Sequence, residues 1–338
     1  MVHRYRTITG IIGFTGWVLL VASSCKDREG TGVAQIDAGA LQLEPPASEQ
    51  KERRAPQVLY LPDGGDVVIG NMLAFSPNVA VPVPSVARNL SRRCPPEMVD
   101  IKGQFCIDRW EASLVDAASK RALSPYYSPE PRRAKAARDQ WDKERLDVGS
   151  ARARATELPE LEEWQTSSHV EPMAISAPGQ VPSGYLDGNT AARACERAGK
   201  RLCTADEWTT ACRGETNKKF PYGDQYEHGT CNVFREAHPA AILHGDASLG
   251  HMDPRLNQVE GPAGALLRRT GATPRCASVW GQDSVYDMVG NLDEWVEDDT
   301  GAFMGGFFAR STRLGCDARI SVHPKPYADY SLGVRCCK

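Results

Sequence analysis

The side chains in this sequence best suited to chemistry are its eleven cysteines. A thiolate attacks substrates or binds a soft metal such as Cu(I), whereas two oxidised thiols form a structural bridge. The spacing gives no strong zinc signal, because no CxxC pair occurs. Cys25 lies near the start, and the other ten cysteines are spread from Cys94 to Cys337. The first question is therefore whether this protein performs sulphur chemistry or uses its cysteines as structural links.

The segment before Cys25 predicts export. Arg4 and Arg6 precede a short apolar run, and small residues stand directly before Cys25, with a polar stretch after it. Such a pattern is typical of a secretory signal, and the run is short for a membrane span. Its end is similar to a bacterial lipobox, so we expect residues 1–25 to be a lipoprotein signal peptide with a lipid anchor on Cys25. The alternatives are ordinary cleavage or an uncleaved anchor.

Export places the rest of the chain in the cell envelope, anchored by lipid on the periplasmic side or at the outer membrane. In that oxidising compartment, the even set of ten cysteines left after Cys25 favours disulfides. A formal charge of −3 gives no electrostatic basis for binding nucleic acid. The expected contact with the membrane is the lipid anchor.

Composition divides the exported chain into a tether and a folded domain. Residues 26–93 are rich in Pro, Ala, Glu and Arg, and such a segment buries too little apolar surface to become ordered, so we expect a flexible tether. Within it, residues 58–70 predict either a brief hairpin or an unstructured tether with one apolar patch. We expect the folded domain over 94–338, with a charged insertion at 128–163 that forms a solvated helix lying over the domain.

Local patterns in the domain indicate which elements hold the cysteines. Two strands across a Lys102–Gly103 turn let Cys94 and Cys106 close a hairpin with a short bridge. One helix ends at Gly199 and a second begins at a capping box, and these helices direct Cys195 and Cys212 to the core. The framework stretch 108–111 is explained by alternating burial on a strand, without chemistry.

Five sequence blocks in register resemble a known family over roughly residues 95–337. In order, the blocks are AGKRLCTADEWTTACRG, FPYGDQY, YDMVGNLDEWVED, MGG and LGVRC. They are similar to those of the sulfatase-modifying-factor, or formylglycine-generating-enzyme, family. The resemblance implies an α+β fold, an irregular variant of the C-type lectin architecture with little regular secondary structure and several disulfides.

Active members of that family oxidise a cysteine of a sulfatase peptide to formylglycine, with molecular oxygen and copper held by two cysteines. That pair follows a Gly-Gly strand, five residues apart, and a structural cysteine lies five residues further on. Here Cys316 matches the structural position, Ser311 stands five residues earlier, and the first position falls on Gly306 or in a gap. Serine supplies no soft thiolate, so we expect no copper and no catalytic residue.

The same resemblance implies how the cysteines pair. It joins Cys195 to Cys336 and Cys212 to Cys316, which ties the two helices to the C-terminal strands. The pairs Cys94–Cys106, Cys231–Cys276 and Cys203–Cys337 are then guesses by elimination. The roles of the adjacent Cys336 and Cys337 remain interchangeable at this point.

The resemblance also implies structural calcium, for which hard oxygens on a tight turn are suited. The matching ligands of the first site are the Asp287 side chain, the carbonyl groups of Gly290 and Leu292, and the Glu294 carboxylate. A second site uses Asn232, the Val233 carbonyl and Asp246. The alternative interpretation is a Gly-Asn turn with surface acids.

Four histidines crowd one loop region and are interpreted as solvent-exposed loop residues, with a transition-metal site as the alternative: His228, His238, His244 and His251. The sequence as a whole predicts a lipid-anchored, calcium-stabilised binding module that binds a peptide or glycan in the family groove. One alternative is an oxidase of altered metal chemistry that uses these histidines. The other is copper-dependent formylglycine generation through a displaced cysteine such as Cys337.

Overall fold

The computed structural model describes the chain at residues 58–60, 66–68, 93–233, 237–262, 264–310 and 312–338. The chain forms two compact units, Met1–Pro84 and Ser85–Lys338. The expected signal peptide with Cys25, most of the expected tether, and Ser311 lie outside the described residues. In the described part, no helix has the length and apolar character needed to cross a bilayer.

The first unit contains a short hairpin among its described residues. Strand β1 (Val58–Tyr60) pairs antiparallel with β2 (Asp66–Val68), and Val58 lies opposite Val68. Of the two interpretations of this stretch, the structure shows the hairpin.

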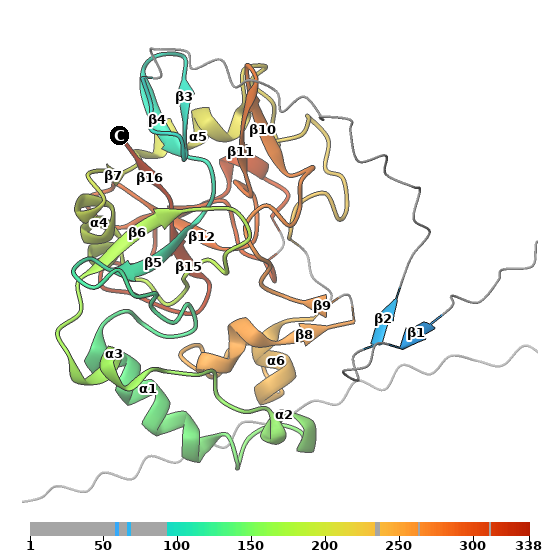
Figure 1. Ribbon diagram of the computed structural model, residues 1–338. Helices are drawn as coiled ribbons and strands as arrows, with labels where there is room; N and C mark the ends of the chain where they lie inside the picture. Colours follow the sequence, from blue (N-terminus) through green and yellow to red (C-terminus); the bar gives the residue numbers. More distant parts are fainter. Residues whose placement is uncertain (1–57, 61–65, 69–92, 234–236, 263, 311) are drawn as a thin grey trace, which may run out of the picture. The chain divides into compact units, whose positions relative to one another are not determined.

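The second unit is the mixed α+β body that the sequence predicts, built from short strands and long connections (Figure 1). One four-stranded sheet has the order β14-β13-β12-β15, with β12 at Asp293–Val296, β13 at Ala302–Met304, β14 at Arg319–Ile320 and β15 at Leu332–Val334. The other has the order β3-β4-β16-β7, with β3 at Met98–Ile101, β4 at Phe105–Asp108, β7 at Arg201–Leu202 and β16 at Cys336–Cys337.

Three two-stranded ribbons and several short helices complete the unit. The ribbons are β5 (Ala112–Asp116) with β6 (Pro172–Ser176), β8 (Glu260–Gly261) with β9 (Gly264–Ala265), and β10 (Ala277–Trp280) with β11 (Asp283–Tyr286). The helices are α1 (Pro131–Glu144), α2 (Ala151–Ala155), α3 (Glu163–Ser167), α4 (Gly188–Arg197), α5 (Ala205–Arg213) and α6 (Pro239–His244), with the 3-10 turns η1 (Pro254–Gln258) and η2 (Gly315–Asp317).

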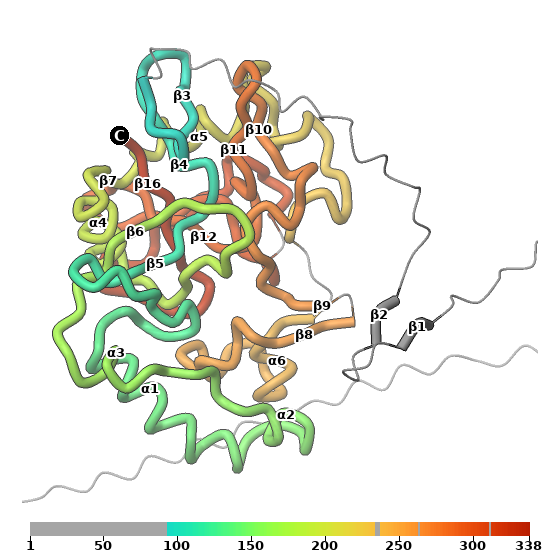
Figure 2. Tube along the Cα trace, viewed as in Figure 1, coloured from blue at the N-terminus to red at the C-terminus, as the bar shows by residue number. Residues whose placement is uncertain are grey.

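The beginning and the end of the second unit pair with each other. Strand β16, at the end of the chain, lies beside β4, near the start of the unit, with Cys337 opposite Ile107 (Figure 2). The alternating burial on a strand expected for residues 108–111 does not occur, because β4 ends at Asp108, Arg109 and Trp110 are half-buried in a bend, and Glu111 is buried after it. Strand β4 is buried at every residue, and Asp108 at its end is fully buried.

Local signals explain where the two cysteine-bearing helices begin. The Asp187 carboxylate accepts a hydrogen bond from the Thr190 N–H at 2.7 Å and caps α4. The predicted capping box begins α5, where the Thr204 hydroxyl accepts from the Glu207 N–H at 3.2 Å and the Glu207 carboxylate accepts from the Thr204 N–H at 2.9 Å. These caps satisfy backbone donors that would otherwise lack partners at the helix starts.

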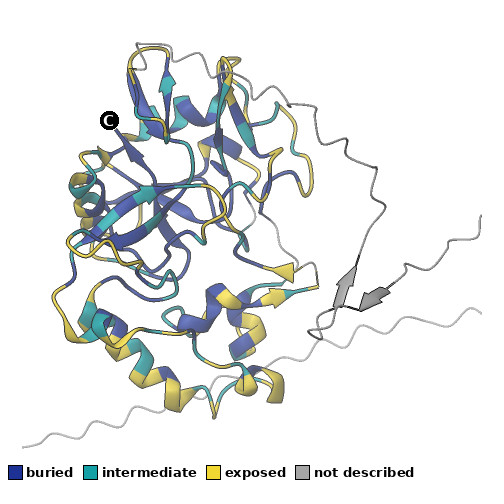
Figure 3. Cartoon of the chain, viewed as in Figure 1, coloured by how far each residue is buried: buried dark blue, intermediate teal, exposed yellow. Residues whose placement is uncertain are grey.

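The charged insertion folds as the two helices α1 and α2 rather than one, and it lies over the body through a thin apolar stripe. Ala134 and Trp141 are buried, and most other side chains of α1 face solvent (Figure 3). Helix α1 contacts α3 and η1, while α2 contacts α6. The Trp141 ring packs against the His244 ring at a centroid distance of 5.0 Å.

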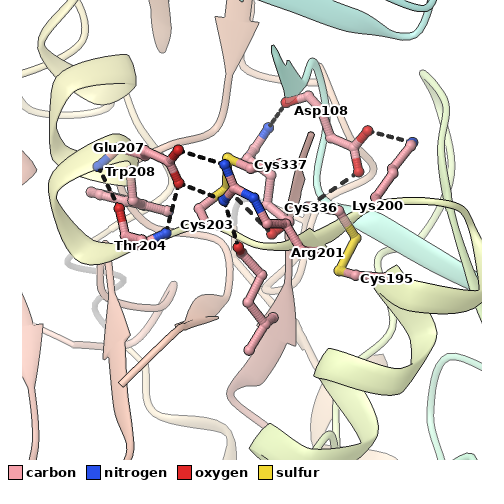
Figure 4. Close-up of a disulfide and its surroundings, with 12 residues drawn as sticks. Asp108, Cys195, Lys200, Arg201, Cys203, Thr204, Glu207, Trp208, Cys336 and Cys337 are labelled. Atoms are coloured by element: carbon pink, nitrogen blue, oxygen red, sulfur yellow. Dashed lines mark hydrogen bonds and ion pairs between the residues drawn. A yellow bond between two sulfur atoms is a disulfide. The ribbon is translucent and has the colours of Figure 1, made fainter. Parts of the chain in front are cut away.

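Five disulfides fasten these irregular segments, and they are the five pairs expected from the sequence. Cys195 on α4 bonds to Cys336, and Cys203 bonds to Cys337 (Figure 4). Side chains alternate along a strand, so the adjacent cysteines of β16 reach two different segments. The other three pairs are Cys94–Cys106, Cys212–Cys316 and Cys231–Cys276.

Candidate functional site

A cavity of about 490 Å³, called the groove from here on, opens beside the loop after β13. Phe307 and Arg310, from the loop after β13, form one wall. His238, His251 and the stretch from His323 to Ser331 contribute the others. Residues nearly a hundred positions apart therefore meet around one space.

The position expected to replace the first copper cysteine has no room for a side chain. Gly306 is buried and has φ +79°, a conformation that residues with a Cβ rarely adopt. A Cβ added there would lie 2.1 Å from Oγ1 of Thr312, well inside van der Waals contact. Thr312 thus occupies the space that a cysteine at Gly306 would need.

One wall of the groove is a continuous stack of rings. Phe303 and His323 lie with centroids 5.9 Å apart and planes 13° from parallel, and His323 and Tyr327 follow at 4.0 Å and 16°. Such a flat aromatic surface binds apolar or ring-shaped ligand faces. The Tyr327 hydroxyl donates to Oδ2 of Asp329 at 2.6 Å, which holds the outer ring of the stack in place.

A histidine and a tyrosine form a second polar element of the groove. The Ala240 N–H donates to Nδ1 of His238 at 3.2 Å, so this nitrogen carries a lone pair and the proton resides on Nε2. Nε2 lies 3.0 Å from the Tyr330 hydroxyl. Burial, together with the charge of nearby His251, lowers the pKa of His238, which favours the same neutral ring.

Beneath the groove, Asp293 holds the side chain of Arg310. Oδ1 of Asp293 accepts from the Arg310 guanidinium at 2.5 Å and from the Gly306 N–H at 2.9 Å. Oδ2 is buried and has no hydrogen-bond partner in the described part of the chain. Burial raises the pKa of Asp293 to about 7, although the Arg310 charge opposes that shift. The ion pair is therefore sensitive to pH near neutrality.

Two of the predicted ligands of the first calcium site, Glu294 and Asp287, lie near a buried guanidinium. Arg335 donates to both carboxylate oxygens of Glu294, at 2.8–3.1 Å, and the Asp287 charge also stabilises this cation. Asp287 itself accepts from the Thr273 hydroxyl at 2.6 Å and the Gly271 N–H at 2.7 Å.

A third carboxylate, Glu111, belongs to the same buried cluster. Burial raises its pKa well above the usual range, and the charges of Asp287 and Glu294 add to this effect. The Glu111 carboxylate accepts from the Leu292 N–H at 3.0 Å. Three carboxylates thus face the single guanidinium of Arg335, which leaves an excess of buried acidic groups.

The second predicted calcium set lies directly beside the first. The Asn291 N–H donates to the Asn232 carbonyl at 3.0 Å, and a Cβ added at Gly290 would approach that carbonyl oxygen to 2.4 Å and a Val233 methyl to 2.5 Å. Oδ1 of Asn232 is buried and has no hydrogen-bond partner among the described residues, so it is free to bind a ligand. Asp246 is exposed and accepts from Ser248, and no described hydrogen bond or ion pair joins it to Asn232.

The structure separates the four loop histidines. His238 and His251 reach the groove, His244 lies 3.1 Å from the Asp253 carboxylate, and His228 is exposed beside Tyr226. Among the described residues, no group of three or more His, Cys, Asp or Glu side chains has an arrangement that holds a metal ion. Several groove residues were not predicted: Asp293, Arg310, His323, Tyr327 and Tyr330. The only local sequence feature that pointed to any of them was the acidic pair Asp293 and Glu294, directly before Trp295.

The Asp293–Arg310 pair predicts a pH dependence of stability. Since the native pKa of about 7 lies above the unfolded value of about 3.9, the native state binds more protons between these limits, and stability falls as pH rises from about 4 to about 7. We expect Asp293→Asn to remove up to about 1.4 kcal/mol per pH unit from the slope of the unfolding free energy in this window. Denaturant unfolding at pH 5, 6 and 8 measures that slope.

The matched control is Asp299→Asn, which changes an exposed aspartate near the end of the same sheet. The control should keep the slope of the unaltered protein. Equal slopes in the unaltered protein and the Asp293→Asn variant would contradict the assignment.

Comparisons with known proteins agree with the resemblance in the sequence. Residues 45–338 match the family model described as "Sulfatase-modifying factor enzyme 1-like domain". Similar solved structures include PvdO from Pseudomonas aeruginosa, which is 14% identical with a TM-score of 0.33, covering 69% of this chain and 79% of that chain. CarF is 13% identical with a TM-score of 0.31, covering 69% of this chain and 85% of that one. No curated protein sequence matches the chain. Over most of its length, the chain belongs to the family of the sulfatase-modifying factor enzyme 1-like domain.

Proposed function

We propose that the second unit is a binding module that keeps the family fold without the copper-dependent oxidation of cysteine. The observation that carries this proposal is the pairing of all ten described cysteines in disulfides. Copper held by the family's mechanism requires two thiolates, and a disulfide sulfur is not one. Against the displaced-cysteine alternative, Cys337 is buried and bonded to Cys203.

The groove supports a binding role. It combines the flat ring stack of Phe303, His323 and Tyr327 with a guanidinium at Arg310 and a carboxylate at Asp329. Its volume of about 490 Å³ lies in the range of small-molecule pockets. The ligand we propose is a peptide or a glycan whose apolar face stacks on the rings while its polar groups contact Arg310 and Asp329.

Two further parts of the proposal concern calcium and export. For the second predicted set, we propose that calcium binds Asn232 and the Val233 carbonyl beside the acidic loop of Asp287 and Glu294, where it would balance the excess of buried acidic groups and fix the two loops to each other. The sequence before Cys25 supports export and a lipid anchor in the cell envelope. The mass of the exported chain tests the anchor, which requires an acylated N-terminal Cys25.

The absence of oxidase chemistry is tested on the exported protein. After unfolding without reductant, we expect no free thiol from the ten cysteines of the second unit. With Cu(I), oxygen and a sulfatase-derived cysteine peptide, mass spectrometry should detect no formylglycine. Copper-dependent conversion of that peptide would exclude the proposal.

The binding role of the groove is tested by Tyr327→Ala, which removes the outer ring of the stack. Peptides and glycans that bind the unaltered protein in an array should bind this variant at least about tenfold more weakly, a loss of about 1.4 kcal/mol. The control is Tyr222→Ala, because Tyr222 also stacks on a ring, that of Phe220, but lies outside the groove. Ligands that tolerate Tyr327→Ala and lose affinity in the control would place binding elsewhere.

Calcium is tested by thermal unfolding. At a concentration about a hundredfold above its Kd, calcium should stabilise the protein by about 2.7 kcal/mol, seen as a rise in Tm that a chelator reverses. Asn232→Ala removes the unpartnered oxygen and should abolish this rise relative to the metal-free variant. The exposed Asn189→Ala should retain it. A full calcium response in the Asn232→Ala protein would show that this oxygen is not a ligand.

A further inference from the structure

A second cavity, of about 660 Å³, is lined by residues outside the groove and has a different chemical character. Its walls come from the loop before α1, the loop before α4, the turn η1 with β8, and the segment after β9. The residues that determine its chemistry are Tyr126, Asn257, Glu260, Leu267, Arg268 and Arg269. None of them was singled out by motif.

Arg268 has a positive charge that no described acidic residue neutralises, and its backbone is held in place by hydrogen bonds. The Arg268 N–H donates to Oδ1 of Asn291 at 3.0 Å, and Nδ2 of Asn291 donates to the Arg268 carbonyl at 3.1 Å, so one buried amide holds the backbone from both sides. In the described part of the chain, the Arg268 guanidinium has no hydrogen-bond or ion-pair partner. A guanidinium without a partner can donate two parallel hydrogen bonds to a planar oxyanion, above all a carboxylate.

The next residue adds a second positive charge. Arg269 donates to the Gly179 carbonyl at 3.0 Å, which positions its side chain without neutralising it. The Arg269 charge also opposes the rise that burial causes in the pKa of Tyr126. Glu260 is the acidic residue that lines the cavity, so the lining carries two positive charges against one negative charge. This balance favours a ligand with a single negative charge.

The cavity also contains acceptors that need donors. Asn257 is 3% exposed; its Nδ2 donates to the Tyr330 carbonyl at 2.8 Å, while its Oδ1 has no partner among the described residues. A buried acceptor without a donor is unfavourable, and a ligand hydroxyl would supply the missing hydrogen bond. Glu260, on the rim, is an additional exposed acceptor. The complementary ligand therefore donates hydrogen bonds besides accepting them.

The remaining lining is apolar and aromatic. The half-buried Tyr126 ring, Val181 and Leu267 supply surface for the carbon skeleton of a ligand. We propose that this cavity binds an acidic sugar. In this assignment the carboxylate binds Arg268, sugar hydroxyls donate to Asn257 and Glu260, and the ring lies against Tyr126. The site is independent of the groove and of the function proposed for it.

The test measures binding of glucuronate to the full-length protein by titration calorimetry, with glucose and inorganic sulfate as comparison probes. We expect glucuronate to bind at least tenfold more tightly than either probe. Arg268→Gln should weaken glucuronate binding at least tenfold. Arg268→Lys should give an intermediate loss, because lysine keeps the positive charge but lacks the paired donors of the guanidinium. The matched control, Arg132→Gln, changes an exposed arginine of α1 without a described partner and should leave affinity unchanged.

The variant Tyr327→Ala separates this site from the groove, and it should bind glucuronate as the unaltered protein does. Glucuronate binding that survives Arg268→Gln, or that is lost with Tyr327→Ala, would overturn the proposal. If glucose binds as tightly as glucuronate, the carboxylate is not recognised by Arg268, and the proposal is overturned. If sulfate binds as tightly as glucuronate, the cavity recognises negative charge alone, and the assignment to a sugar is overturned.

Discussion

The structure of the second unit depends on the disulfides that join its two cysteine-bearing helices to segments more than a hundred residues away. Strands of two to five residues and helices separated by long loops provide few continuous backbone ladders. The bridges at Cys195, Cys203 and Cys212 close loops of 141, 134 and 104 residues. In the chain-entropy model a loop of this length, closed by itself, contributes about 5 kcal/mol by restricting the unfolded chain, and because the three loops overlap the second and third bridges contribute less. The same kind of bond pairs all ten described cysteines, which is the observation on which the proposed absence of copper chemistry rests.

Strand β12 connects the main polar features of the unit. Because side chains alternate along a strand, neighbouring acids of β12 face different surroundings. Asp293 reaches Gly306 and Arg310 beneath the groove, while Glu294 pairs with Arg335 and accepts from the Trp208 ring at 2.6 Å. The guanidinium of Arg335 also donates to the Asp108 carbonyl at 2.9 Å, which links β12 to the other four-stranded sheet. The floor of the groove is thus part of the network that joins the two sheets.

Tyr330 lines the groove and also supports a residue of the second cavity. Its hydroxyl meets His238 in the groove, and its backbone carbonyl fixes the Asn257 amide in the second cavity. Asn291 has a comparable position, since its side chain holds the Arg268 backbone and contacts Asn232 of the proposed calcium loop. The binding surfaces are therefore supported by buried amides and a buried ring on a disulfide-linked frame, which keeps their shape without long helices or strands.

The sequence by itself determined the family, the irregular α+β class and the capping box at Thr204, because these follow from short-range patterns and from the order of the blocks. The resemblance implied two of the cysteine pairs, and the structure decided which partners the adjacent Cys336 and Cys337 take. The sequence also located the loops around Asn232 and Asp287, which the structure brings into contact. Only the tertiary structure decided that His238, Arg310 and Tyr327 share a groove, that His244 belongs to a different pair, and that Arg268 faces a cavity. The physical reason is that these residues lie on long connections without periodicity, where position is set by packing and disulfides, and local sequence carries no signal of it.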